Sequence, residues 1–413
     1  MKLIFDVSDK PKAGQLVVFA LQQMLAILAA TIAVPLIIGN GLTPAAAMFG
    51  AGVGTIVYIL FTKRKSPVFL GSSFAFLGSM AAAFAGGVSM QLGMLGLIIG
   101  ALLAGLVYVV IAIVVKFVGV GWLNKLMPAV VIGPTVAIIG LSLAGNAIGD
   151  LLKGDVTKQV TEYAVSTDSG TPEIIETVSN VPVGSSYVAL ICGLITLAVV
   201  MLCSTYGKKT LRLIPFIIGI LAGYAAAAIF TVIGNICDID ALKIVDFSVF
   251  SSYMLTDGSV SLKTFVSLPD FAFVSGLKGL KEFDLTYFAT IFVAYVPVAL
   301  VVFAEHVADH KNLSSIIDHD LLEEPGLTRT LLGDGVGSIA GALFGGCPNT
   351  TYGESVACVA ITGNASVVTI FAAAIGCMLF SFITPLVAFV DSIPACVMWR
   401  LYCSLRLYRS FRS

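Results

Sequence analysis

The chain has 413 residues, of which 58% are hydrophobic and only 11% are charged, and its formal net charge is −1. A soluble globular domain carries roughly 25% charged residues, so this composition excludes an ordinary water-soluble protein, and the net charge gives no reason to expect a nucleic-acid partner. The eight cysteines lie mostly within apolar runs and form no CxxC pair, which is typical of small buried side chains rather than of disulfides or a zinc site.

Apolar segments recur along the whole chain, and most approach the roughly 20 residues that a helix needs to cross a bilayer. In chain order, the predicted spans are residues 15–38, 43–61, 67–85, 92–115, 127–148, 186–203, 213–236, 287–305, 327–344, 349–361 and 365–390, with a twelfth beginning near Pro394. The first run is too long for the core of a signal peptide, and acidic residues precede it, so we expect no cleavable signal. The sequence predicts an all-α polytopic membrane protein.

Lysine and arginine residues alternate between the predicted loops. They cluster before the first span and at residues 63–65, 116–125 and 208–212, whereas the long polar loops at 149–185 and 237–284 are mixed or acidic. Cytoplasmic loops are enriched in lysine and arginine. We therefore expect a cytoplasmic amino terminus.

The two halves of the chain share a layout. The third span opens at Pro67 and is rich in serine and glycine, and the weak tenth span, after Pro348, has the same character. The copies are offset by seven helices, so the second is inverted. Broken helices at corresponding positions of an inverted repeat indicate the binding site of a transporter. The alternative is that both are kinked helices packed by small residues, as we expect for Gly337, Gly341 and Gly345.

Acidic residues within predicted spans mark a candidate site, because a carboxyl group in a membrane segment costs a few kcal/mol. Glu354 directly follows the second break, and Glu305 and Asp309 are four residues apart, on one helix face. An alternative interpretation is that Glu305 marks the cytoplasmic end of its helix. Asp334 is predicted to be interfacial or a packing polar residue.

The three histidines do not form a catalytic or metal-binding pattern. His306 and His310 are predicted to lie off the Glu305 face, and His319 falls in a loop. We therefore expect no enzyme. An ion channel would require a filter repeated by symmetry, and the sequence contains no such filter.

Four motifs carry a resemblance to a known family: residues 69–76 (FLGSSFAF), 304–307 (AEHV), 324–327 (EPGL) and 348–354 (PNTTYGE). Across residues 15–398 the chain resembles the bacterial uracil permease branch of the nucleobase/ascorbate transporter family. The resemblance implies a fourteen-helix fold of two inverted seven-helix repeats, here cut short in the twelfth helix, with short strands in the third and tenth segments. A core domain would comprise helices 1–4 (residues 15–118) and helices 8–11 (285–391). A gate domain would comprise helices 5–7 (119–237) and an incomplete, aberrant helix 12 (392–413).

The resemblance also implies a function: proton-coupled import of uracil across the cell (inner) membrane, by a protein that forms a homodimer in the lipid bilayer. No cofactor is expected, because the proton is the coupling ion. The alternatives are a transporter of xanthine or another nucleobase, a truncated non-transporting fragment, or an ion channel.

Uracil is a planar ring with two N–H donors and two carbonyl acceptors, so its site needs carboxylates, free backbone amides and one aromatic face. The resemblance implies an aromatic stack, two carboxylate acceptors and backbone amide donors. Phe74 would supply the aromatic stack, and Glu305 and Glu354 would be the two acceptors. The donors would be the backbone amides around Ser73, Ala75, Tyr352 and Gly353. Glu305 would lie at mid-membrane and carry the proton together with Asp309.

Three positions depart from the family pattern. Gln22-Gln23 replaces a Gln-His pair, Asp309 stands where a histidine is frequent, and Glu354-Ser355-Val356-Ala357 replaces Glu-Asn-x-Gly. Asp309 is predicted to act as the titrating partner of Glu305.

The last fifteen residues, 399–413, are basic and unlike the rest of the chain. Arg400 and Arg406 fall where the membrane interior is expected. We expect a truncated or frame-shifted reading of a longer chain; the alternative is a natural basic cytoplasmic tail.

Overall fold

The computed structural model describes residues 3–119, 121, 148–149, 151–154, 156–166, 173–207, 215–254 and 262–398. The chain divides into two compact units. The first comprises Met1–Ser142 and Tyr253–Asp391, and the second comprises Leu143–Ser252 and Ser392–Ser413. Nearly all of the span predicted at residues 127–148 lies outside the described residues, as does the chain after Met398.

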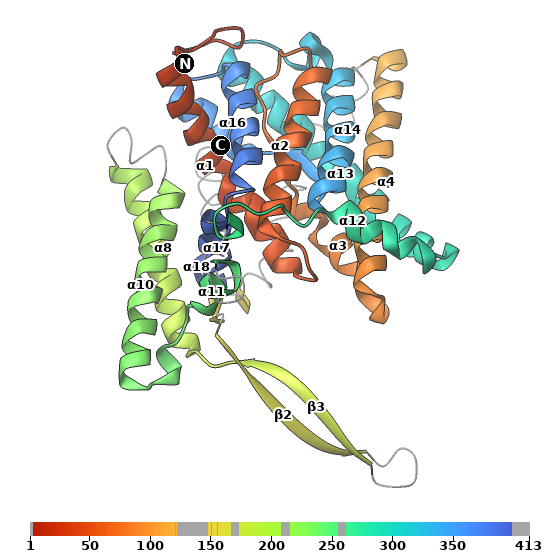
Figure 1. Cartoon of the computed structure of the whole chain (residues 1–413). Helices are drawn as coiled ribbons and strands as arrows, with labels where there is room; N and C mark the ends of the chain where they lie inside the picture. The colour runs from red at the N-terminus through yellow and green to blue at the C-terminus, as the bar shows by residue number, and fades with distance from the viewer. Residues whose placement is uncertain are drawn as a thin grey trace. The chain divides into compact units, whose positions relative to one another are not determined.

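The first unit is a bundle of apolar helices (Figure 1). Its longer helices are α1 (Ala13–Ile38), α2 (Pro44–Phe61), α4 (Met90–Val118), α13 (Leu285–Ile317), α14 (Leu327–Gly345) and α16 (Val367–Phe380). The eight-residue helix α17 (Thr384–Asp391) follows α16. Its shorter helical segments are η1 (Phe74–Phe76), α3 (Leu77–Ala83), η2 (Ala85–Gly87), η4 (Leu262–Thr264), α12 (Ala272–Gly276), η5 (Leu277–Lys281), η6 (Leu322–Gly326) and α15 (Gly353–Thr362). Within the described residues, α1, α2, α4 and α13 of this unit are long and apolar enough to cross a membrane.

Helices α2 and α14 lie side by side in this unit because glycines line their contact (Figure 1). A Cβ atom added to Gly337 would lie 2.8 Å from the Gly54 carbonyl oxygen, and one added to Gly341 would lie 2.9 Å from the Gly50 carbonyl oxygen. Small residues let helix backbones approach in this way. The prediction that Gly337 and Gly341 pack a helix interface is confirmed.

The third and tenth predicted spans are both interrupted. In the third, strand β1 (Leu70–Ser72) precedes η1 and α3, and in the tenth, strand β4 (Asn349–Thr351) precedes α15. The two predicted short strands are therefore present, and each is followed by a short helix.

The eleventh predicted span, residues 365–390, is two helices rather than one. Helix α16 ends at Phe380 and α17 begins at Thr384. Pro385, at the start of α17, cannot donate the backbone hydrogen bond that a continuous helix requires. The backbone groups of the break pair instead with residues 265–267: the Thr384 amide donates to the Phe265 carbonyl at 3.1 Å, and the Ser267 amide donates to the Phe382 carbonyl at 3.0 Å.

The second unit contains the apolar helices α8 (Ser186–Tyr206) and α10 (Pro215–Cys237), each with a stretch long and apolar enough to cross a membrane. It also contains the short segments η3 (Asp240–Leu242) and α18 (Ala395–Met398), and most of α11 (Ser248–Met254).

The polar loop predicted at residues 149–185 contains a β-hairpin that the sequence analysis did not predict. Strands β2 (Thr157–Ser166) and β3 (Glu173–Pro182) pair antiparallel over ten residues, from Thr157 opposite Pro182 to Ser166 opposite Glu173 (Figure 1). Valine and threonine occur in both segments and isoleucine in β3, and these residues favour extended backbone. Hydropathy alone does not detect a polar hairpin, because its residues bury no continuous apolar run.

Candidate functional site

The site is built on the antiparallel pair β1 and β4 in the first unit. Leu70 lies opposite Thr351, and Ser72 lies opposite Asn349. The Ser73 amide donates to the Pro348 carbonyl at 2.9 Å and the Tyr352 amide donates to the Phe69 carbonyl at 3.2 Å. Two interrupted segments that are far apart in the chain are thus joined by backbone hydrogen bonds.

Polar side chains from the flanking helices hold this strand pair. The Thr55 hydroxyl on α2 accepts the Leu70 amide at 3.0 Å. The Asn349 side-chain amide donates to the Gly50 carbonyl at 3.0 Å, and the Ser338 hydroxyl on α14 accepts the Asn349 amide at 3.0 Å. Buried polar groups need such partners, which explains why α2 and α14 carry threonine, serine and glycine here.

The ends of the strand pair lead directly into η1 and α15. The first N–H groups of a helix have no acceptor within it, and Ala75 in η1 and Gly353 in α15 occupy such early positions. Ser73 and Tyr352 differ, because their amides already bind the opposite segment. The Tyr352 hydroxyl, moreover, donates to the Ser72 carbonyl at 2.6 Å.

Exposure separates two groups among the predicted site residues. Ser73 is 2% exposed and Tyr352 is 4% exposed. The others are half-buried in a neighbourhood that is otherwise closed: Phe74, Ala75, Glu305, Gly353 and Glu354. The half-buried set supplies one aromatic ring, two carboxyl groups and two positions in the first helical turn after a strand.

Glu305 lies well inside helix α13, which continues for a further twelve residues to Ile317. The interpretation that Glu305 marks a helix end is therefore wrong. One turn later, Asp309 is 3% exposed and accepts a hydrogen bond from the Thr351 hydroxyl at 3.1 Å. This contact connects the acidic face of α13 to strand β4.

Two positions that depart from the family pattern meet in space. The Gln23 side-chain amide on α1 donates to the Ser355 hydroxyl on α15. The same hydroxyl accepts the Phe69 amide at 3.1 Å, and Gln23 and Ser355 are both buried. Ser355 therefore links α1, the entry to β1 and the first turn of α15, next to Glu354. Nothing in the local sequence of either residue indicates this pairing.

A second polar cluster, which sequence reasoning missed, lies on other faces of α13. His306 and His310 are fully buried, and Asp334 on α14 is 1% exposed. The His306 Nδ1 atom lies 2.7 Å from Asp334 Oδ2, and the His310 Nε2 atom lies 2.7 Å from the Tyr58 hydroxyl on α2. Asp334 is thus a packing residue and not an interfacial one. The signal that could have found the cluster is the four-residue spacing of the two histidines, which places both on one face.

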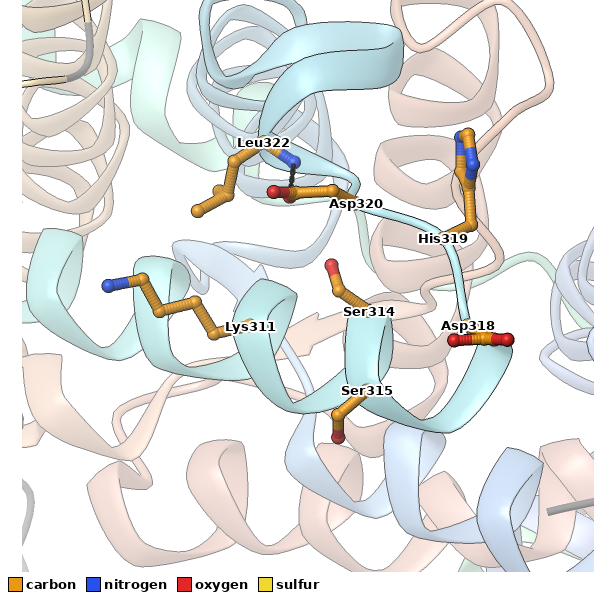
Figure 2. Close-up of a pocket in the computed structure, with 7 residues that line it drawn as sticks. All are labelled: Lys311, Ser314, Ser315, Asp318, His319, Asp320 and Leu322. Carbon is orange, nitrogen blue, oxygen red and sulfur yellow. Dashed lines mark hydrogen bonds between the residues drawn. The ribbon is translucent and has the colours of Figure 1, made fainter.

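A separate surface hollow lies where α13 turns toward α14, away from the strand pair (Figure 2). It is lined by Lys311, Ser314, Ser315, Asp318, His319, Asp320 and Leu322. The Asp320 carboxylate accepts the Leu322 amide at 2.8 Å (Figure 2), so this carboxylate caps the turn. None of the predicted site residues lines the hollow.

The same turn carries an exposed ion pair between Lys65 and Glu324. The hydrogen bond from the Lys65 ammonium group, and its charge, hold the pKa of the Glu324 carboxyl below its usual range. Across the described parts of the chain, no group of three histidine, cysteine or acidic side chains is arranged to hold a metal ion.

Comparison with known proteins decides the family. A family model described as a permease family matches residues 14–181 and 169–399. The chain belongs to this permease family. Uracil permeases from Bacillus caldolyticus and Bacillus subtilis are 34% and 33% identical to it, each match covering 96% of this chain and 78% of the relative. The uracil permease of Escherichia coli K12 is 32% identical over 97% of this chain and 78% of its own length.

Solved structures agree with a polytopic helical fold for this permease. The transmembrane domain of the cyanobacterial bicarbonate transporter BicA superposes with a TM-score of 0.63 at 14% identity, covering 97% of this chain and 90% of that domain. The murine anion transporter Slc26a9 gives a TM-score of 0.59 at 12% identity, covering 96% of this chain and 60% of that one. At these identities the likeness concerns the fold alone. The permease is a multi-pass membrane transport protein and not an enzyme.

Proposed function

We propose that this permease is a secondary transporter that imports uracil, bound where β1 and β4 lead into η1 and α15. The observation that carries the proposal is the half-buried set of one aromatic ring, two carboxyl groups and two helix starts. A uracil ring needs acceptors for two N–H groups and donors for two carbonyl oxygens, and one face for stacking. Relatives that share about a third of the sequence are uracil permeases.

Each member of the half-buried set has a proposed role. Phe74 stacks on the pyrimidine, and Glu305 and Glu354 accept its ring N–H groups. The amides near Ala75 and Gly353 donate to its carbonyl oxygens. Ser73 and Tyr352 have a positioning role, because their amides bind the opposite segment and hold β1 and β4 together next to the ligand-contacting residues.

We also propose that uptake is coupled to protons through Glu305 and Asp309. A carboxyl group enclosed by apolar surroundings favours its neutral form, so a proton can bind on one side of the membrane and leave on the other. The one-turn spacing of the two acids and the contact of Asp309 with Thr351 support a shared role. Protonation of Asp309 would then act on the substrate contacts through Thr351 in β4.

We propose an inverted repeat for the architecture. Its support is that β1 and β4 pair antiparallel and that each precedes a short helix. The core domain would be formed by residues 15–118 and 285–391, and the gate domain by 119–237 and 392–413. The two compact units divide the chain at the same point after Asp391, but the first unit extends to Ser142 rather than to residue 118. A cytoplasmic amino terminus, an inner-membrane location and a homodimer complete the proposal.

Uptake of radiolabelled uracil in cells that lack their own uracil permease tests the function. Cells expressing the chain should accumulate label above the external concentration, whereas a channel would only equilibrate it. Glu354→Gln should reduce uptake by about tenfold, since the neutral amide oxygen accepts a weaker hydrogen bond than a carboxylate does. Asp318→Asn, on the exposed turn, is the matched control and should leave uptake unchanged.

A second candidate substrate is another nucleobase, because a 27% identical relative in Escherichia coli is a putative pyrimidine permease, RutG. Competition by unlabelled thymine, xanthine and uracil separates these options. Uracil should compete at the lowest concentration. Stronger competition by xanthine would contradict the proposed substrate. In liposomes, an imposed pH gradient should drive uracil accumulation, and no response to the gradient would refute proton coupling.

A further inference from the structure

We propose that Asp334 and His306 form a buried proton-binding site between α14 and α13 that at neutral pH holds one proton beyond the single ring proton of a neutral histidine. This site is distinct from the pair of acids proposed for transport coupling. It does not depend on the identity of the transported molecule. The inference rests on which atoms can donate and accept in the hydrogen bonds around His306.

The chain of hydrogen bonds begins at Thr330 on α14. The Thr330 hydroxyl lies 3.1 Å from the Leu327 carbonyl oxygen and 3.1 Å from His306 Nε2. A hydroxyl has one proton and a carbonyl can only accept. When Thr330 donates to Leu327, its oxygen must accept from His306, so Nε2 carries a proton.

The contact of the other ring nitrogen, Nδ1, then shows that the pair must hold a further proton. It lies 2.7 Å from Asp334 Oδ2. If His306 is neutral with its proton on Nε2, Nδ1 is an acceptor and Asp334 must be a carboxylic acid that donates to it. If Asp334 is ionised, His306 must carry both protons. In either case the pair holds one proton more than an anionic aspartate beside a neutral histidine.

The remaining arrangement has the Thr330 hydroxyl donating to His306 Nε2, with the ring proton on Nδ1 and Asp334 anionic. Burial disfavours it, because Asp334 is 1% exposed and its Oδ1 atom has no hydrogen-bond partner among the described residues. An ionised carboxylate buried without charge compensation is costly. A neutral acid that donates from Oδ2 leaves only a carbonyl oxygen unpaired, which costs much less.

The described groups that face the pair are neutral or acidic. Tyr108 on α4 packs edge-on against the His306 ring and is within electrostatic range of Asp334, Glu305 and Asp309. Tyr58 on α2, which is also within range of Asp334, is a neutral phenol.

His310 does not share the proton. Its Nδ1 atom donates to the His306 carbonyl at 2.8 Å, so in the neutral ring Nε2 accepts from the Tyr58 hydroxyl at 2.7 Å. That hydroxyl in turn accepts from Ser66, at 2.7 Å. The two imidazole rings stack at 4.1 Å, where two positive charges would repel. The extra proton therefore stays between His306 and Asp334.

Spectroscopy on the purified full-length chain in lipid nanodiscs tests the site without any substrate. The chain has only three histidines, so ¹⁵N-histidine spectra can be assigned with His310→Gln and His319→Gln. Infrared difference spectra of the wild type against Asp334→Asn report protonated carboxyl groups. The asparagine side chain keeps a donor toward Nδ1, so this substitution preserves the hydrogen bond.

The proposal expects one of two results at pH 7. Asp334→Asn removes one protonated-carboxyl band, or else both ring nitrogens of His306 are protonated in the wild type. Asp318→Asn, on the exposed turn, should remove no such band. The proposal is overturned if no band is lost and only one of the two ring nitrogens of His306 is protonated. If Asp334→Asn does not fold, the wild-type ¹⁵N spectrum together with ¹³C-aspartate labelling decides between the same results.

Discussion

Replacement of Ser355 by alanine tests how the first turn of α15 is held. The Ser355 hydroxyl accepts from two buried donors, the Gln23 side chain and the Phe69 amide. Alanine provides no acceptor for either. A buried donor left without a partner costs about 1–3 kcal/mol, so Ser355→Ala should destabilise the protein by roughly 2–6 kcal/mol if neither donor finds another acceptor.

A double substitution sharpens this prediction. The double variant Gln23→Leu/Ser355→Ala also removes the Gln23 side-chain donor, so only the Phe69 amide is left without an acceptor. Its expected loss of stability is about 1–3 kcal/mol. Thermal melting of the detergent-purified protein should therefore rank the wild type first, the double variant second and Ser355→Ala last. Thr205→Ala is the control, because it removes only an exposed hydroxyl bond within helix α8. It should change stability by no more than about 0.5 kcal/mol.

Two results would refute this reasoning. If the double variant melts at or below the temperature of Ser355→Ala, the Gln23 donor is not paired with Ser355. If Ser355→Ala has the same melting temperature as the wild type, the Ser355 hydroxyl does not stabilise the segment that leads into β1.

Three further predictions concern other parts of the first unit. Asp309→Asn should abolish accumulation driven by a pH gradient while preserving exchange of labelled for unlabelled uracil; an unchanged pH profile of uptake would exclude Asp309 from coupling. Gly341→Val should prevent recovery of monodisperse protein in size-exclusion chromatography, because its Cβ would clash with the Asn349 side chain and then with the Gly50 carbonyl of α2. Gly14→Ala, with open space around it, should behave as the wild type. Lys65 lowers the pKa of Glu324, so this pair stabilises the fold at neutral pH and the effect is lost as the pH falls through that lowered pKa. Glu324→Gln should accordingly reduce the melting temperature slightly at pH 7 and not in strong acid, and high salt should remove the difference.

Much of the helical layout could be predicted because it depends on local properties of the chain. The predicted spans at residues 15–38, 43–61 and 92–115 lie within a few residues of the ends of α1, α2 and α4. Apolar run length and flanking glycine or proline determine such helices locally. The interruptions after Pro67 and Pro348 follow from the same signals.

Other features could not be read from local pattern. The split between α16 and α17 depends on residues 265–267, which supply partners for the broken backbone. The hairpin β2–β3 lies in a stretch too polar for hydropathy to detect. The helix that carries Glu305 runs on to Ile317 through a charged sequence, because His306, Asp309 and His310 are buried against neighbouring elements.

For the candidate site, the sequence by itself determined the chemistry that is available: an aromatic ring, acids within apolar segments and two interrupted segments. Only the tertiary structure decided which of these groups meet. It pairs β1 with β4, joins Gln23 to Ser355 across 332 residues of chain, and places Asp334 against His306. The physical reason is that a buried polar atom must find a partner wherever the fold brings one near, and proximity between distant segments is set by helix packing rather than by the residues adjacent in sequence.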